Sequence, residues 1–128
     1  MHLCFPKVFL TVGTTEFEGL VDILAADSSH SLVNALADLY GCKHIVVQIG
    51  RGQCEPYEAA KYCQSRGVTL EWYRFKDSIR SDITTSDLVI SHCGAGTILE
   101  VLKLNKPLIV VVNETLQGSS ELTVPYRT

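Results

Sequence analysis

Residues 87–112, DLVISHCGAGTILEVLKLNKPLIVVV, place a strand, a glycine loop, a helix and a second strand in one stretch. The apolar run Asp87–Ser91 predicts the first strand, and Thr97–Leu104 predicts an amphipathic helix. Leu108–Val112 predicts the next strand. Two strands joined through a helix are expected to lie parallel, because the helix carries the chain back to the starting edge of the sheet.

The same alternation of apolar strands and helices runs through the rest of the chain. It is typical of a parallel sheet covered on both faces, the doubly wound α/β class. Right-handed crossovers then bring the carboxyl ends of the strands to one edge, where such folds bind ligands. The other expected strands are Val8–Val12, His44–Ile49 and Val68–Phe75, and the other expected helices are Phe17–Leu24, Ser31–Tyr40, Glu55–Arg66 and Lys76–Thr84.

Bulk composition excludes several classes of protein. The 128 residues are enough for one domain with its own core, and the net charge of −3 gives no footprint for nucleic acid or an anionic membrane. The five cysteines show no CxxC spacing, which favours reduced thiols in the cytosol over a disulfide framework or zinc site. The longest apolar run, Pro107–Val112, is far shorter than the roughly 20 residues of a membrane span. No signal peptide is indicated at the start of the chain.

The last residues differ in character from the rest. Residues 114–128, ETLQGSSELTVPYRT, bring glycine, serines and proline in quick succession. A helix over Glu114–Leu122 is conceivable, but nothing after it could add another layer. We therefore expect a single domain over residues 1–128 that is truncated at its C-terminus.

Three glycine-bearing loops follow expected strands and so fall on the ligand edge. They are Gly13–Phe17, Gly50–Gln53 and Ser91–Thr97. Gly13 permits a close backbone approach and Thr14 could bind a phosphate, although the loop taken alone is better explained as a plain strand-to-helix turn. The second loop, with Arg51 between two glycines, could reach an anionic group or carry only a solvated charge.

The third loop has the strongest pattern. Gly94, Ala95 and Gly96 would let main-chain N–H groups face a diphosphate at the positive end of the following helix. The dinucleotide fingerprint GxGxxG would need a glycine at Leu99, and the lysine of a P-loop is missing. Glu100, about one turn into the helix, could accept hydrogen bonds from ribose hydroxyls. It could equally be an exposed residue near the helix dipole.

Two side chains of this loop are candidates for chemistry. His92 could contact a sugar or phosphate, act as a base, or only shape the loop, and a ligand or loop contact is favoured over proton transfer. Cys93 has no partner base nearby in the sequence, which argues against a nucleophilic role.

Four blocks of sequence together resemble one family: FLTVGTTEFEGLV (9–21), VVQIGRG (46–52), YRFKDSI (73–79) and SDLVISHCGAGTILEVLKLNKPLIVVVNE (86–114). They are similar to the soluble subunit of the heterodimeric UDP-N-acetylglucosamine transferase of the dolichol pathway of N-glycosylation. The resemblance implies the Rossmann-like donor half of a GT-B fold. It implies transfer of the second GlcNAc, β1,4 and with inversion, from UDP-GlcNAc to GlcNAc-diphosphate-dolichol, with no cofactor or metal.

The resemblance also implies partners and site residues. A membrane-anchored subunit would supply the acceptor half and hold this cytoplasmic chain at the cytosolic face of the endoplasmic reticulum. By position, Gly94, Ala95 and Gly96 would face the diphosphate, Glu100 the ribose, and Gly13 with Thr14 the opposite side. His92 remains a candidate ligand contact. The general base is not identified and would come from the partner's side.

The chain departs from the family after Glu114. Residues 119–121, Ser-Ser-Glu, stand where the family has an asparagine-histidine-glutamine run, and a carboxylate at Glu121 is unfavourable near a diphosphate. The C-terminal helices that follow in the family have no counterpart. The alternative is therefore a truncated, non-catalytic variant that acts only through protein contacts. A nicotinamide-dependent enzyme is disfavoured by the missing GxGxxG spacing.

Overall fold

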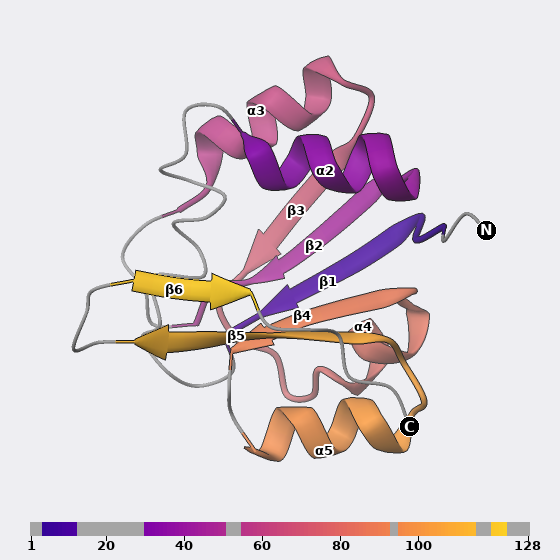
Figure 1. Ribbon diagram of the computed structural model, residues 1–128, viewed down its shortest axis with the longest axis vertical. Coiled ribbons are helices and arrows are strands. Elements are labelled where there is room, and N and C mark those ends of the chain that lie inside the picture. The colour runs from indigo at the N-terminus through magenta and orange to yellow at the C-terminus, as the bar shows by residue number, and fades with distance from the viewer. Residues whose placement is uncertain (1–3, 13–29, 51–54, 93–94, 115–118, 123–128) are drawn as a thin grey trace.

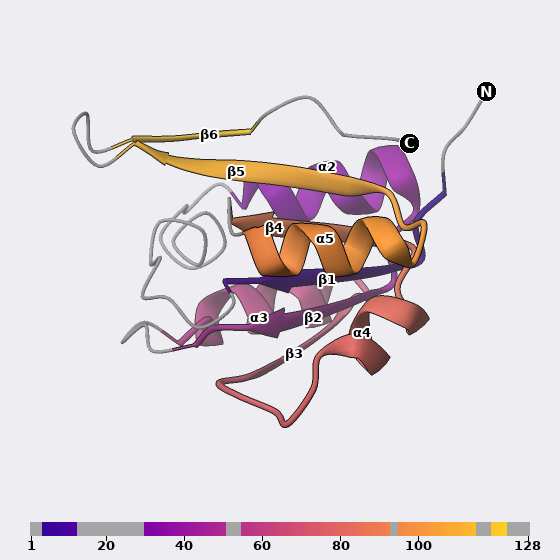
Figure 2. The same ribbon diagram turned by 90° about the horizontal axis from the view of Figure 1, so that it is seen from below.

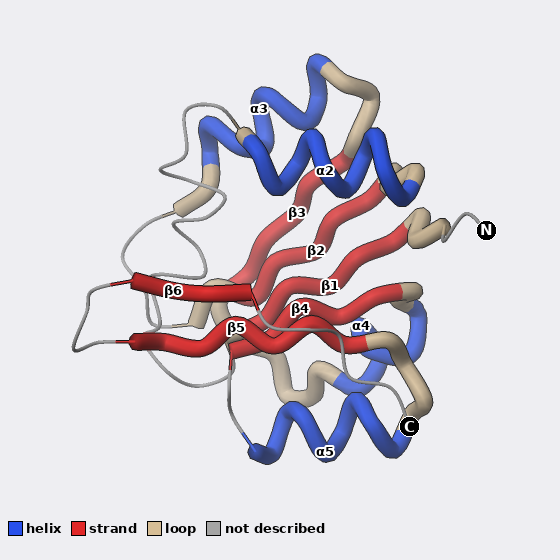
Figure 3. The backbone as a smooth tube through the Cα atoms, viewed as in Figure 1, coloured by secondary structure: helices blue, strands red, loops and turns tan. Residues whose placement is uncertain are grey.

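A six-stranded sheet in the order β3-β2-β1-β4-β5-β6 forms the centre of the molecule (Figure 1). The computed structural model describes residues 4–12, 30–50, 55–92, 95–114 and 119–122. The first five strands run parallel, as the sequence predicts and as their arrows show in Figure 1. Figure 3 shows the strands in red and the helices in blue. The strands are β1 (Lys7–Thr11), β2 (His44–Gln48), β3 (Thr69–Tyr73), β4 (Leu88–His92), β5 (Leu108–Glu114) and β6 (Ser119–Leu122).

The last strand corrects one expectation from the sequence. The described parts of the segment 114–122 are strand and not helix: β5 continues to Glu114, and β6 (Ser119–Leu122) pairs with it antiparallel, with Val111 opposite Leu122. Glycine and serine are weak helix formers, whereas the open edge of β5 offers backbone groups that need hydrogen-bond partners. The sheet therefore has five parallel strands, and the antiparallel strand β6 forms one of its edges, beside β5.

Four helices cover the two faces of the sheet: α2 (Ser31–Tyr40), α3 (Tyr57–Ser65), α4 (Arg80–Thr85) and α5 (Ala95–Lys103). Helices α2 and α3 pack on one face and α4 and α5 on the other (Figure 2). The bounds of α2 agree with the sequence pattern, because Gly41 takes a left-handed φ of 66° and donates its N–H to the carbonyl of Leu36. The helix expected near residues 17–24 lies outside the described residues.

Three helices differ from their expected bounds, and one of them is α3, which spans only Tyr57–Ser65 in place of Glu55–Arg66. Helix α4 begins only at Arg80, since residues 76–79 form an irregular segment in which Ser78 Oγ accepts the Arg80 N–H at 3.1 Å. Helix α5 begins at Ala95, two residues earlier than expected. That earlier start puts Ala95 and Gly96 into the first helical turn.

Each face of the sheet has its own apolar core. Alternate residues of the strands point to opposite faces, so Val8 and Leu10 pack with α2 and α3 whereas Phe9 packs with α4 and α5. The core on the α2–α3 side is the larger, and it includes Ile45, Val47 and Ile90. Because β1 is buried on both faces, its apolar run is continuous, as in other parallel sheets.

A buried polar row interrupts the core at the carboxyl ends of the strands. Thr11, Gln48 and Ser91 are all buried, and they continue the α4–α5 face of β1, β2 and β4. Thr11 Oγ1 donates to Gln48 Oε1 at 2.5 Å, and Gln48 Nε2 donates to the carbonyl oxygen of Arg74 at 2.7 Å. These bonds tie the ends of β1, β2 and β3 together beneath the ligand edge.

Replacing Leu10 with alanine is expected to lower the free energy of unfolding by about 2–5 kcal/mol, because the side chain is buried in the central strand. Leu39→Ala is the matched control, since Leu39 is 65% exposed on α2 and should change stability by less than about 0.5 kcal/mol. Urea denaturation of both variants measures the difference. Equal stability of the two variants would contradict the burial of β1.

Thr11→Val keeps the shape of the side chain but removes the hydroxyl that donates to Gln48. We expect a loss of about 1–3 kcal/mol of unfolding free energy, because the bond is fully buried. Thr69→Val makes the same chemical change at an exposed position of β3 and should cost about 0.5 kcal/mol at most. A Thr11→Val variant as stable as the unchanged chain would show that the polar row contributes nothing to stability.

Candidate functional site

The strand order has a topological switch point at β1. From β1 the chain passes to β2 on one side, whereas β4, which follows β3 and α4, pairs on the other side. In open α/β sheets, ligands bind outside the carboxyl ends of the strands at such a point. Thr11 and Ser91 are register partners there, which places the ligand edge above the ends of β1 and β4.

Three of the expected site residues lie at this edge of the sheet. His92 ends β4, and Ala95 and Gly96 open α5. Gly13 and Thr14, which follow β1 in the sequence, lie outside the described residues, as does Gly94. The structure thus places His92, Ala95 and Gly96 at the switch point. The ligand roles of these three residues, like those of the three that are not described, stay predictions.

The first turn of α5 offers backbone donors at this edge. The first four N–H groups of a helix have no partner within it, and the helix dipole adds positive partial charge there. A Cβ atom built on Gly96 would meet no atom of the described residues within 4 Å, so none of them fills the space beside its backbone. This arrangement suits an anionic group such as a diphosphate.

Glu100 lies four residues after Gly96, on the same side of α5 and about 6 Å further along the helix axis. Its side chain is partly exposed, and Oε1 lies 3.9 Å from Nη1 of Arg80 on α4. A carboxylate one turn below the helix start could bind ribose hydroxyls while the diphosphate meets the N–H groups above. The facing arginine was not anticipated from the sequence.

A cluster of hydrogen-bonded polar side chains lies on the α4–α5 face of the sheet, at the end of β3. The Tyr73 hydroxyl donates to Asp82 Oδ2 at 2.5 Å, and Lys76 Nζ lies 3.2 Å from the same oxygen. Burial, and then the hydrogen bond to Asp82 and its charge, raise the pKa of Tyr73 well above its ordinary value. The tyrosine therefore stays protonated as a donor, and the cluster fixes the irregular segment before α4.

Arg74 is a second residue that the sequence pattern did not single out. Its Nη1 donates to the carbonyl oxygen of Gly50 at 3.2 Å, and its Nη2 lies 3.8 Å from Glu55 Oε2. Gly50 in turn donates its N–H to the Arg74 carbonyl, with a left-handed φ of 63°. Arg74 thus contacts the two residues that flank positions 51–54, which themselves lie outside the described residues.

The described thiols are not reactive groups of the site. Cys42 and Cys63 are buried, and burial raises the pKa of both, to about 11 for Cys63. Cys4 is exposed near the amino ends of the strands. Cys93 lies outside the described residues, so the argument against its nucleophilic role stays a prediction.

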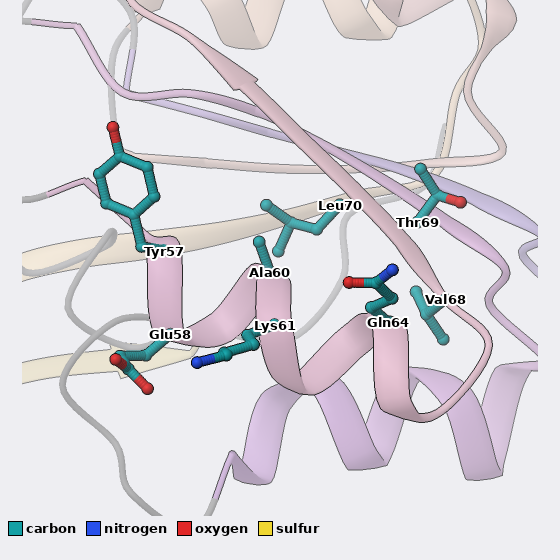
Figure 4. A pocket seen from close by; sticks show the side chains of 8 residues that line it. All are labelled: Tyr57, Glu58, Ala60, Lys61, Gln64, Val68, Thr69 and Leu70. Carbon is teal, nitrogen blue, oxygen red and sulfur yellow. The ribbon is translucent and has the colours of Figure 1, made fainter.

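An open hollow lies elsewhere, between α3 and the start of β3 (Figure 4). Its lining includes Tyr57, Lys61 and Thr69. It is at the amino end of an edge strand and therefore far from the switch point. The strand order and the start of α5 are better guides to a ligand site than this hollow.

Two further properties bear on possible ligands. Within the described ranges, no three His, Cys, Asp or Glu side chains converge as they would around a metal ion. None of the helices in the described part of the chain has both the length and the apolar character needed to cross a membrane.

The sequence and the fold are similar to known proteins. Residues 7–121 match the glycosyltransferase family 28 C-terminal domain. The chain is 43% identical over 115 residues to the UDP-N-acetylglucosamine transferase subunit ALG13 of Mus musculus, and 30% identical over 145 residues to the protein of the same name from Saccharomyces cerevisiae. These alignments cover 90% and 89% of this chain, but 9% of the mouse protein and 68% of the yeast protein.

A solution NMR structure of ALG13 has the same fold. It matches 88% of this chain and 68% of its own, with a TM-score of 0.59 and 24% sequence identity. The chain spans only about a tenth of the length of the mouse and human relatives, so these matches concern one domain of those proteins. Since the family match extends over nearly all of its residues, the chain belongs to the glycosyltransferase family 28 C-terminal domain family.

Proposed function

We propose that residues 1–128 form the donor-binding domain of a UDP-N-acetylglucosamine transferase. The observation that carries the proposal is the position of α5 at the switch point, with no described residue filling the space beside Gly96 and a carboxylate at Glu100 one turn below. In a nucleoside diphosphate the phosphates are next to the ribose, in the same order as the N–H groups at the start of α5 and the carboxylate of Glu100. The family and the names of the relatives support the choice of UDP-GlcNAc.

In the proposed reaction, the chain adds the second GlcNAc to GlcNAc-diphosphate-dolichol in a β1,4 linkage. The acceptor hydroxyl attacks the anomeric carbon from the side opposite UDP, so the configuration inverts. Charge builds up on the departing diphosphate, where the N–H groups of Ala95 and Gly96 and the dipole of α5 would stabilise it. His92, at the end of β4, would contact the ligand or shape the loop, and Gly94, Gly13 and Thr14 would complete the surroundings.

The acceptor side and the general base are assigned to a partner. The relatives are named as subunits, which supports a second chain. We propose that this partner is membrane-anchored, carries the base, and holds the cytoplasmic chain at the cytosolic face of the endoplasmic reticulum. The resulting heterodimer would be the active species.

UDP at a hundredfold excess over its Kd is expected to stabilise the chain by about 2.7 kcal/mol, visible as a rise in Tm. Glu100→Ala should weaken UDP binding about tenfold or more, because hydrogen bonds to a charged group contribute roughly 1.5–3 kcal/mol. Glu58→Ala removes an exposed carboxylate from α3, on the opposite face, and should leave the shift unchanged. The proposal fails if neither UDP nor UDP-GlcNAc at millimolar concentration changes the Tm.

Co-expression with the membrane-anchored partner should allow co-purification of the two chains and transfer of GlcNAc to a lipid-linked acceptor. Residues 1–128 alone should show no transfer, because the proposal assigns the acceptor side and the base to the partner. Glu100→Ala is expected to reduce transfer, with Glu58→Ala as the control. Co-purification without transfer would favour the alternative of a non-catalytic chain that acts through protein contacts.

A further inference from the structure

Arg80 is the cationic side chain that faces Glu100 across the gap between α4 and α5. Its Nη1 lies 3.9 Å from Glu100 Oε1, which is an ion-pair distance but longer than a hydrogen bond. The Arg80 side chain is 65% exposed and that of Glu100 is 35% exposed. The guanidinium is thus close enough to offset the carboxylate and exposed enough to reorient towards a ligand.

The neighbouring cations of the same segment are engaged in holding the fold. Arg74 donates to the Gly50 carbonyl and lies beside Glu55, and Lys76 contacts Asp82 and lies 4.4 Å from the centre of the Tyr73 ring. Arg80 is the most exposed of the three. Among the described cations of residues 74–80, it is therefore the best placed to meet an incoming anion.

We propose that Arg80 recognises the diphosphate of the bound nucleotide and offsets the charge of Glu100, an inference that rests on the proposed function. Glu100 alone would repel a diphosphate held about one helical turn away at Gly96. Nη1 of Arg80 lies 3.9 Å from the Glu100 carboxylate, well within the Debye length of about 8 Å at physiological ionic strength, so its charge offsets that of Glu100.

Glu100 and Arg80 would contribute to donor binding in two different ways. Glu100 would recognise the ribose by hydrogen bonding, whereas Arg80 would act mainly through its charge. A contribution through charge weakens as salt rises, because the pair is partly exposed to solvent. Salt dependence therefore distinguishes the proposed role of Arg80 from a purely structural one.

The test measures the Kd of UDP by calorimetry for the unchanged chain, Arg80→Gln, Arg80→Lys and the control Lys61→Gln. Lys61 is exposed on α3, on the opposite face of the sheet, so Lys61→Gln makes the same change in net charge outside the proposed site. Each Kd is measured at about 0.01 M and about 1 M salt, where the Debye lengths are about 30 Å and 3 Å.

At low salt, Arg80→Gln is expected to weaken UDP binding about three- to tenfold relative to Lys61→Gln, and at high salt by less than about twofold. Arg80→Lys, which keeps the charge, should stay within about twofold of the unchanged chain. An equal loss at both salt concentrations, no loss for Arg80→Gln, or a lysine variant as weak as the glutamine variant would overturn the inference. Failure of the unchanged chain to bind UDP would overturn the proposed function and the inference with it.

Discussion

The parallel pairing of β1 with β2 on one side and β4 on the other is the constraint on which the rest of the structure depends. Thr11 pairs with Gln48 and with Ser91, so the carboxyl ends of three strands meet at one level. Both faces of β1 are buried, which forces an apolar sequence along the strand. Where that sequence turns polar, at Thr11, the side chain is hydrogen-bonded to Gln48. On the α4–α5 face the apolar core ends there and the ligand edge begins, whereas Val12 and Ile49 extend the core on the other face.

The site proposed above that edge is built mostly from backbone. Ala95 and Gly96 would contribute N–H groups, which no pattern of charged residues reveals, and the chain as a whole is acidic. The charges that matter are local: Glu100 on α5 faces Arg80 on α4. In the proposed site, the positive field at the start of α5 and the charge of Arg80 would act on an anion more strongly than the distant carboxylates of a chain with net charge −3.

The sequence predicts those parts of the fold that have a local cause. Apolar runs locate the parallel strands, and Gly41 marks the end of α2 because that position needs a left-handed backbone. The strand β6 could not be foreseen, since its cause is the unpaired edge of β5 and not its own serine-rich sequence. The contacts Arg80–Glu100 and Tyr73–Asp82 join side chains of different elements at spacings that follow no periodic pattern. The ligand roles of all the expected site residues stay predictions: Gly13, Thr14, His92, Gly94, Ala95, Gly96 and Glu100.

The central place of β1 also has a consequence for synthesis on the ribosome. Lys7 donates its N–H to Asp87 across a separation of 80 residues, and Val8 pairs with Leu88. At about 5–20 residues per second, translation needs roughly 4–16 seconds to supply β4 after β1 has been made. During that interval an apolar strand that is later buried on both faces lacks one of its two neighbours. Nascent chains of this fold therefore have a defined period in which chaperones that bind extended apolar segments would find a substrate near the N-terminus.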